Sequence, residues 1–147
     1  MKLRRVLTSV VTAAALIGIA APAASADTII NATNYDHCGG GFCLFYNSNQ
    51  QGAFRQFTGS VSSFANGSTF NVVGTTSAGY GQGVWNNAAS ASWWNTSSPC
   101  NNCTTIGYTH ARVYYNSNYM GAWDQIDKGY GGNLQSTYND NASLRLY

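Results

Sequence analysis

The chain has 147 residues with 7 Lys and Arg against 5 acidic residues, a formal net charge of +2, and only 8% charged residues, about a third of the share in an ordinary soluble domain. All five acidic residues are Asp, which excludes paired-glutamate chemistry and a HExxH zinc helix. The positive charge is too small and too scattered for a nucleic-acid binder. The 44% share of hydrophobic residues argues against disorder, and the length suits one domain.

Residues 1–26 have the features of an export signal. A basic start at residues 2–5 precedes a nearly continuous apolar run over 10–21 and the small-residue sequence Ala-Ser-Ala at 24–26, which signal peptidase cuts. A membrane anchor is the alternative, but the apolar run is interrupted and too short to span a bilayer comfortably. We therefore expect cleavage before Asp27, secretion, and no membrane association of the mature chain.

Removal of the signal changes the charge balance. The mature chain keeps four basic and five acidic side chains and so has a net charge of −1. They are Arg55, Arg112, Lys128 and Arg145, and Asp27, Asp36, Asp124, Asp127 and Asp140. We expect no nucleic-acid partner and binding that depends little on salt.

The four cysteines lie in two close pairs, Cys38 with Cys43 and Cys100 with Cys103. An exported chain reaches an oxidising compartment, so we expect two disulfides. Four cysteines allow three pairings, and the short spacings favour the two local ones, which would stiffen small loops. A redox-active pair is the alternative for Cys100-Asn101-Asn102-Cys103, but the βαβ context and helix start that it needs are not evident.

After residue 27 the chain predicts strands and no helix. Gly, Asn, Ser and Thr recur every few residues, and short alternating runs rich in Val, Tyr, Phe and Trp lie between them. This pattern is typical of an all-β sandwich or barrel.

The chain also contains an internal repeat. Residues 45–54, FYNSNQQGAF, recur as residues 114–123, YYNSNYMGAW, with six of ten positions identical and two more exchanging one aromatic residue for another. Each copy has a later tail, WNNAAS at 85–90 and YNDNAS at 138–143, followed by a short strand. A period of two places four side chains of these strands on one buried face, namely Ala91, Trp93, Leu144 and Leu146.

The repeat divides the mature domain, residues 27–147, into two motifs. Motif one covers about 42–94, a polar linker covers 95–109, and motif two covers about 110–147. The first copy has 16 more residues between its leading aromatic residue and its tail serine, and the Gly-, Ser- and Asn-rich stretch 59–79 is the natural place for them.

The repeated residues predict a hairpin that folds back over its own sheet. The bend needs a residue that tolerates positive φ, which Gly52 and Gly121 supply. A large flat side chain, Phe45 in one copy and Tyr114 in the other, would cap the fold. The tail serine of each copy can tie the hairpin down by a side-chain bond to its backbone.

Each copy has an aromatic residue, then six residues, a glycine and a later serine. This repeated pattern resembles the Greek-key motif of βγ-crystallins, whose domain packs two such motifs as a β-sandwich. The chain is more specifically similar to the secreted bacterial branch of that superfamily, peptidase inhibitor family I36. The similarity rests on the cysteine pair within residues 38–46 and on the Asn-Asn-x-x-Ser tail before Trp94-Asn95-Thr96, and it covers residues 38–147. The resemblance implies a disulfide closing each cysteine pair and a non-enzymatic inhibitor of extracellular proteases, with metalloproteases first.

The first candidate site is the loop with the second cysteine pair. Its residues are Ser97, Ser98, Pro99, Cys100, Asn101, Asn102, Cys103 and Thr104. An inhibitor needs a rigid exposed segment that enters a protease cleft at little ordering cost, and a disulfide with an adjacent proline preorganises one. A stapled connector between two motifs is the alternative.

The second candidate is a calcium site in the two tails. Calcium-binding relatives supply oxygen ligands from an (Asn/Asp)-(Asn/Asp)-x-x-(Ser/Thr)-Ser loop, and the matching residues are Asn86, Asn87, Ser90, Asn139, Asp140 and Ser143. The sixth position is Ala91 or Leu144, so a hydroxyl ligand is missing from both copies. With one carboxylate across two sites, calcium would bind no more tightly than about 10⁻⁴ to 10⁻³ M. Hairpin-shaping Asn and Ser turns are the alternative, and no other cofactor is expected.

The third candidate is recognition by exposed aromatic rings. Trp93 and Trp94 are adjacent, so on a strand they face opposite ways, and exposed rings suit carbohydrate or cell-wall contacts. Core packing is the alternative and already accounts for Trp93. Catalysis has no motif, because His37 and His110 lie in different segments and no GxSxG sequence is present. We therefore expect a monomeric inhibitor, with a structural or antimicrobial module as the alternative.

Overall fold

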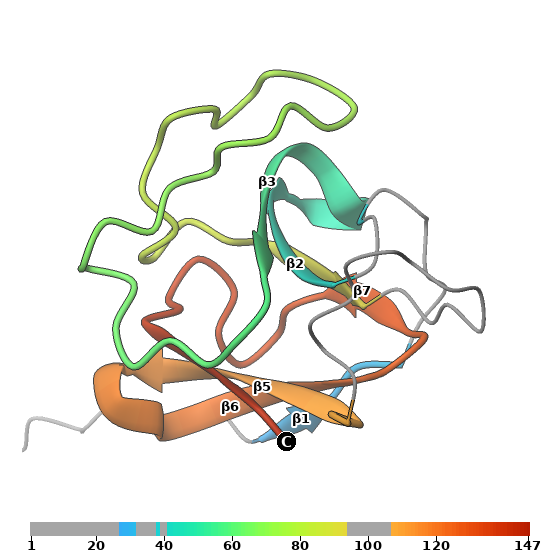
Figure 1. Cartoon of the computed structure of the whole chain (residues 1–147), viewed down its shortest axis with the longest axis vertical. Helices are drawn as coiled ribbons and strands as arrows, with labels where there is room; N and C mark the ends of the chain where they lie inside the picture. Colours follow the sequence, from blue (N-terminus) through green and yellow to red (C-terminus); the bar gives the residue numbers. More distant parts are fainter. Residues whose placement is uncertain (1–26, 32–37, 39–40, 94–106) are drawn as a thin grey trace, which may run out of the picture.

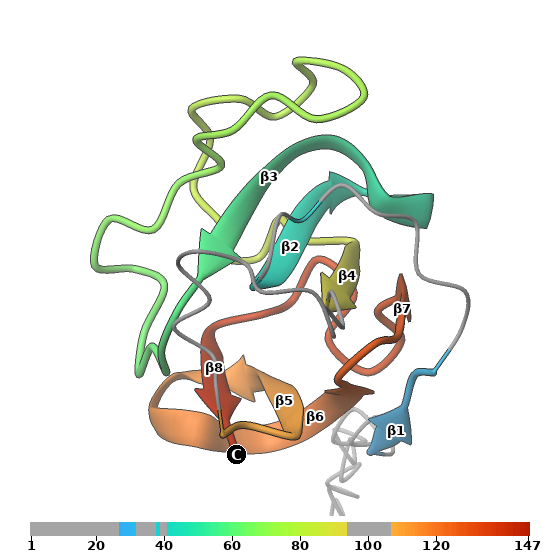
Figure 2. The ribbon, with the colours of Figure 1, turned by 45° about the vertical axis from the view of Figure 1, so that its right-hand side comes forward.

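The computed structural model describes residues 27–31, 38, 41–93 and 107–147. Its strands are β1 (Thr28–Ile29), β2 (Phe42–Asn47), β3 (Gln51–Phe57), β4 (Ser90–Trp93), β5 (His110–Asn116), β6 (Met120–Asp127), β7 (Gly131–Asn133) and β8 (Ser143–Leu146). Within these residues they form two four-stranded sheets with the orders β3-β2-β4-β7 and β1-β6-β5-β8. Figure 2 shows the sheets as two layers of a sandwich, which confirms the expected all-β architecture.

The two motifs exchange strands. β2, β3 and β4 of motif one form three strands of one sheet, and the fourth, β7, comes from motif two and pairs with β4. In return, Val61 of motif one pairs with Leu144 in β8 through two backbone hydrogen bonds of 2.8 and 2.9 Å. Each sheet is therefore completed by the other motif, and the chain between β6 and β8 passes to the opposite layer (Figure 2).

The core lies between the layers and is built from alternate residues of the paired strands. Trp93 and Phe42 are fully buried, with their rings edge to face at 5.7 Å. Ala91 and Leu144 are also fully buried, and Leu146 is 5% exposed. The alternation expected for the two tail strands is therefore confirmed.

Both hairpins bend where the repeat predicts. Gly52 has φ +80° and Gly121 has φ +79°, a region that side chains with a Cβ rarely adopt. Short 3₁₀ turns, η1 (Ser48–Gln50) and η2 (Ser117–Tyr119), precede these glycines. Within the described residues the helical segments are such single turns, and none is long or apolar enough to cross a membrane.

A tail serine secures each hairpin, as expected. Ser90 Oγ donates to Asn47 O at 2.6 Å and accepts from the Gln50 amide at 2.9 Å. In motif two, Ser143 Oγ donates to Asn116 O at 2.6 Å and accepts from the Tyr119 amide at 3.1 Å. Gln50 and Tyr119 hold positive φ values of 58° and 63°. The serine thus compensates a backbone conformation that is unfavourable for a non-glycine residue.

The extra residues of motif one lie between Val61 and β4 and run along the outer edge of β3 (Figure 1, green to yellow). Phe54 and Val72 exchange backbone hydrogen bonds of 2.9 and 3.1 Å, and the Ala53 amide donates to Ala78 O at 2.8 Å. This segment protects an edge that would otherwise present unpaired backbone groups. It falls in the region expected from the length difference between the two copies.

A small second core lies on the outer face of the β3-β2-β4-β7 sheet. The Cys38–Cys43 disulfide is formed across a Cα–Cα distance of 5.9 Å, and both cysteines are fully buried. Phe45 and Phe54 pack in the same cluster with ring centroids 5.3 Å apart. The local pairing of the first two cysteines is therefore confirmed, whereas Cys100 and Cys103 lie outside the described residues.

Two features have no counterpart in the sequence predictions. β1 adds a parallel strand beside β6, with Thr28 opposite Asp124. The carboxylate of Asp124 is fully buried and accepts hydrogen bonds from the backbone amides of Gln135, Ser136 and Thr137 and from the Thr137 hydroxyl, at 2.7 to 3.1 Å. This carboxylate holds the turn that leads into the tail of motif two.

We expect Ser90→Ala and Ser143→Ala each to lower the free energy of unfolding by about 1–3 kcal/mol, because each removes two hydrogen bonds between a buried hydroxyl and the hairpin backbone. Chemical denaturation measures the change. Ser77→Ala, on the exposed added segment, is the control and should change stability by less than about 0.5 kcal/mol. Equal effects of all three changes would contradict the assigned role of the tail serines.

Candidate binding site

The predicted inhibitory loop, residues 97–104, and Trp94 lie outside the described residues, but the chain on either side of the linker is described. Trp93 ends β4 in one sheet, where its amide donates to Tyr130 O at 2.8 Å and its carbonyl accepts from the Gly129 amide at 2.9 Å. His110 begins β5 in the other sheet, and the preceding Thr109 amide donates to Tyr147 O at 2.6 Å. The linker therefore joins two anchored points in different layers.

The two Asn-rich tails cross each other between the motifs. The backbone N–H of Asn86 donates to Asn141 O at 2.9 Å, and the backbone N–H of Asn139 donates to Ala88 O at 2.9 Å. Asn86 and Asn139 are equivalent positions of the repeat and have matching φ values of 55° and 53°. The exchange is therefore reciprocal and relates the motifs by an approximate two-fold axis. The proximity of the tails follows from the strand exchange, since the sequence places them far apart.

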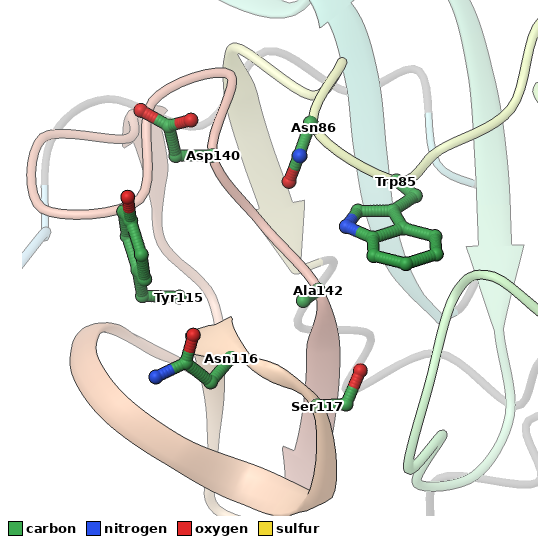
Figure 3. Close-up of a pocket in the computed structure, with 7 residues that line it drawn as sticks. All are labelled: Trp85, Asn86, Tyr115, Asn116, Ser117, Asp140 and Ala142. Atoms are coloured by element: carbon green, nitrogen blue, oxygen red, sulfur yellow. The ribbon is translucent and has the colours of Figure 1, made fainter.

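A pocket of about 250 Å³ opens beside this crossing (Figure 3). It is lined by Trp85, Asn86, Tyr115, Asn116, Ser117, Asp140 and Ala142. Trp85 and Asn86 come from the tail of motif one, and the other residues come from the hairpin and tail of motif two. The pocket thus exists only where the two motifs meet.

The comparisons with known proteins bear on the fold. No family model and no curated protein matches the chain. A solved structure described under "Evolution of the eye lens beta-gamma-crystallin domain fold" is similar, with a TM-score of 0.51 and 14% identity over 79% of this chain and 91% of that chain. The chain has a βγ-crystallin-like fold. At this identity the likeness shows the fold alone.

In the two tails, most of the predicted calcium ligands are hydrogen-bonded within the domain or do not line the pocket. The Ser90 and Ser143 hydroxyls bind the hairpins, and the Asn87 amide nitrogen donates to Gly83 O at 2.9 Å and Trp85 O at 3.2 Å. Ala91 and Leu144, at the position of the missing hydroxyl ligand, lie in the core. Of the six predicted ligands, Asn86 and Asp140 line the pocket.

These two side chains do not form a converging donor set. Figure 3 shows the Asp140 carboxylate and the Asn86 amide pointing in different directions. Among the described residues, no group of three or more His, Cys, Asp or Glu side chains is placed to hold a metal ion. One carboxylate with neutral oxygen donors fits at most a weak calcium site.

The aromatic surface of this βγ-crystallin-like domain is built from residues that the sequence analysis did not single out. On the outer face of the β1-β6-β5-β8 sheet, the Arg112 guanidinium lies 4.0 Å from the centroid of the Trp123 ring and 5.3 Å from that of Tyr147. Arg145 lies 5.0 Å from the Tyr147 centroid and 5.5 Å from that of Tyr119. Arg112 and Arg145 are directly opposite on neighbouring strands, so the rings between them offset the repulsion of like charges.

Tyr114 lies beneath this face and is 5% exposed. Its hydroxyl is 2.6 Å from that of Tyr147. Burial, together with the hydrogen bond to Tyr147, raises the pKa of Tyr114 from 10.0 to about 12, although the nearby Arg112 acts in the opposite direction. The folded protein therefore binds the Tyr114 proton more tightly than the unfolded chain does.

We expect the stabilising contribution of protonated Tyr114 to be complete below pH 10 and to be lost as the pH rises toward 12. Phenolate absorbance during an alkaline titration should show a step near pH 12, and Tyr114→Phe should remove that step. Tyr80→Phe, at a tyrosine that is 57% exposed, should leave the step unchanged. A wild-type titration without a late step would contradict the assignment.

Proposed function

We propose that this chain is an exported, non-enzymatic protein that inhibits an extracellular protease through the loop 97–104. The observation that carries the proposal is the anchoring of Trp93 and His110 in opposite layers by backbone hydrogen bonds. A segment whose two ends are already held loses less conformational entropy when it binds a cleft. A Cys100–Cys103 bridge next to Pro99 would restrict it further.

Two other features support this proposal. The crystallin-like fold is generally non-enzymatic. The buried Cys38–Cys43 disulfide suits an oxidising compartment, in agreement with export through residues 1–26. The resemblance to peptidase inhibitor family I36 suggests a metalloprotease as the first target.

The test is inhibition of a thermolysin-like and a subtilisin-like protease by the purified mature chain, residues 27–147. We expect inhibition of the metalloprotease at micromolar inhibitor. Joint replacement Cys100→Ser and Cys103→Ser should raise the inhibition constant about tenfold or more, because the free loop must then be ordered on binding. Ser77→Ala is the matched surface control and should leave the constant unchanged.

Absence of inhibition at micromolar protein would overturn the proposed function. Inhibition that the double cysteine replacement leaves intact would move the inhibitory site away from the loop.

The second candidate function is that of a calcium-stabilised structural module. It is favoured by the position of Asn86 and Asp140 on one pocket. With a Kd of about 1 mM, 10 mM calcium would stabilise the fold by about 1.4 kcal/mol. A melting temperature that rises with calcium in the wild type and in Asp27→Asn, but not in Asp140→Asn, would support this candidate. A melting temperature independent of calcium would exclude it.

A further inference from the structure

The pocket between the motifs is flanked by two large aromatic side chains that the fold leaves half open. Trp85 and Tyr115 are each 46% exposed. Figure 3 shows them on opposite sides of the hollow, with polar side chains between them. Packing within the domain uses only part of each ring surface, so the remaining surface is available to a ligand.

Polar groups around the same pocket are also available. Within the described part of the chain, no hydrogen bond is made by three side chains of the pocket, those of Asn86, Asn116 and Asp140. Some other asparagine side chains of the domain are engaged in the fold. For example, the Asn141 amide nitrogen donates to Ala88 O at 2.7 Å, and Asn133 binds Asn49 through both of its amide atoms. The pocket therefore offers two amides and one carboxylate that the fold does not use.

The repeat provides an internal comparison for this site. The positions equivalent to Tyr115, Trp85 and Asp140 are Tyr46, Tyr138 and Asn87. In that copy, the Ser48 and Tyr138 hydroxyls are hydrogen-bonded at 3.1 Å, and the Asn87 side-chain amide donates to the carbonyls of Gly83 and Trp85.

The added segment of motif one covers Tyr46, the counterpart of Tyr115. Tyr46 packs edge to face on Phe70 at 5.7 Å, and the backbone at Gly79 lies directly against the Tyr46 ring. In motif one, Tyr46 is therefore covered by the protein itself, whereas Tyr138 is 44% exposed. In motif two, the equivalent Tyr115 has no such cover among the described residues, and Asp140 makes no side-chain hydrogen bond like that of Asn87.

We propose that the pocket lined by Trp85, Tyr115 and Asp140 binds one ring of a neutral saccharide. Aromatic rings cover the C–H faces of a sugar, while amide, hydroxyl and carboxylate groups match its alternating donors and acceptors. The volume of about 250 Å³ lies just below the range of about 300–1,000 Å³ typical of pockets for drug-sized ligands and suits a single ring. The lining contains a carboxylate and no cationic side chain, which disfavours an anionic ligand.

The test is calorimetric titration of the purified protein with tetrasaccharides of β-1,4-linked glucose, N-acetylglucosamine, mannose and xylose, in EDTA. We expect at least one to bind in the millimolar range or better. Trp85→Ala and Tyr115→Ala should each weaken that binding about tenfold. Trp85→Tyr should retain part of it, because tyrosine keeps an aromatic ring at this position. Asp140→Asn should weaken binding by removing the strongest acceptor.

Tyr130→Ala is the matched control, because Tyr130 is also 46% exposed but does not line the pocket. It should leave the affinity unchanged, and circular dichroism and thermal melting should show that all variants are folded. Absence of binding by every tetrasaccharide at millimolar concentration would overturn the proposal. Binding that Trp85→Ala and Tyr115→Ala leave unchanged, or that appears only with calcium present, would also overturn it.

Discussion

The structure depends on the exchange of backbone pairing between two halves of one chain. β7 of motif two completes the sheet of motif one, and Val61 of motif one pairs with Leu144 in the opposite layer. Each motif therefore covers one edge strand of the other's sheet, β7 beside β4 and Val61 beside β8, and the two halves share one core. The same exchange brings the tails side by side, where Asn86 and Asn139 donate across the approximate two-fold axis. The pocket is therefore a product of the exchange.

Departures from symmetry give the two motifs different surfaces. The added segment covers the hairpin of motif one, protects the β3 edge and packs over Tyr46. The outer face of the same sheet carries the small core with Phe45 and the Cys38–Cys43 disulfide. Among the described residues motif two has no equivalent segment, and Tyr115 is exposed. The outer face of its sheet carries the interleaved arginines and aromatic rings. The two motifs thus share a frame, but the aromatic residue that is covered in motif one, Tyr46, has an exposed counterpart in motif two.

Local chemistry predicted the hairpins well. The bends at Gly52 and Gly121 and the serine ties follow from requirements that act within one motif, namely tolerance of positive φ and a short side chain that reaches a nearby backbone group. From the sequence, the two tails could be compared with the calcium-binding sequence pattern, but the positions of their oxygen atoms could not be predicted. Whether its oxygens converge depends on the relative position of two tails from different motifs, and in the structure Asp140 and Asn86 point apart.

The sequence by itself determined the all-β class, the duplicated motif, the buried alternation of the tail strands and the first cysteine pair, because each depends on spacing within a few residues. Only the tertiary structure decided which side chains meet across the two halves. The burial of Asp124 on three backbone amides, the stacking of Arg112 on Trp123 and the pairing of Trp85 with Tyr115 around one pocket all join residues of different segments. Such contacts arise from strand order and layer packing, which no local pattern of residues encodes.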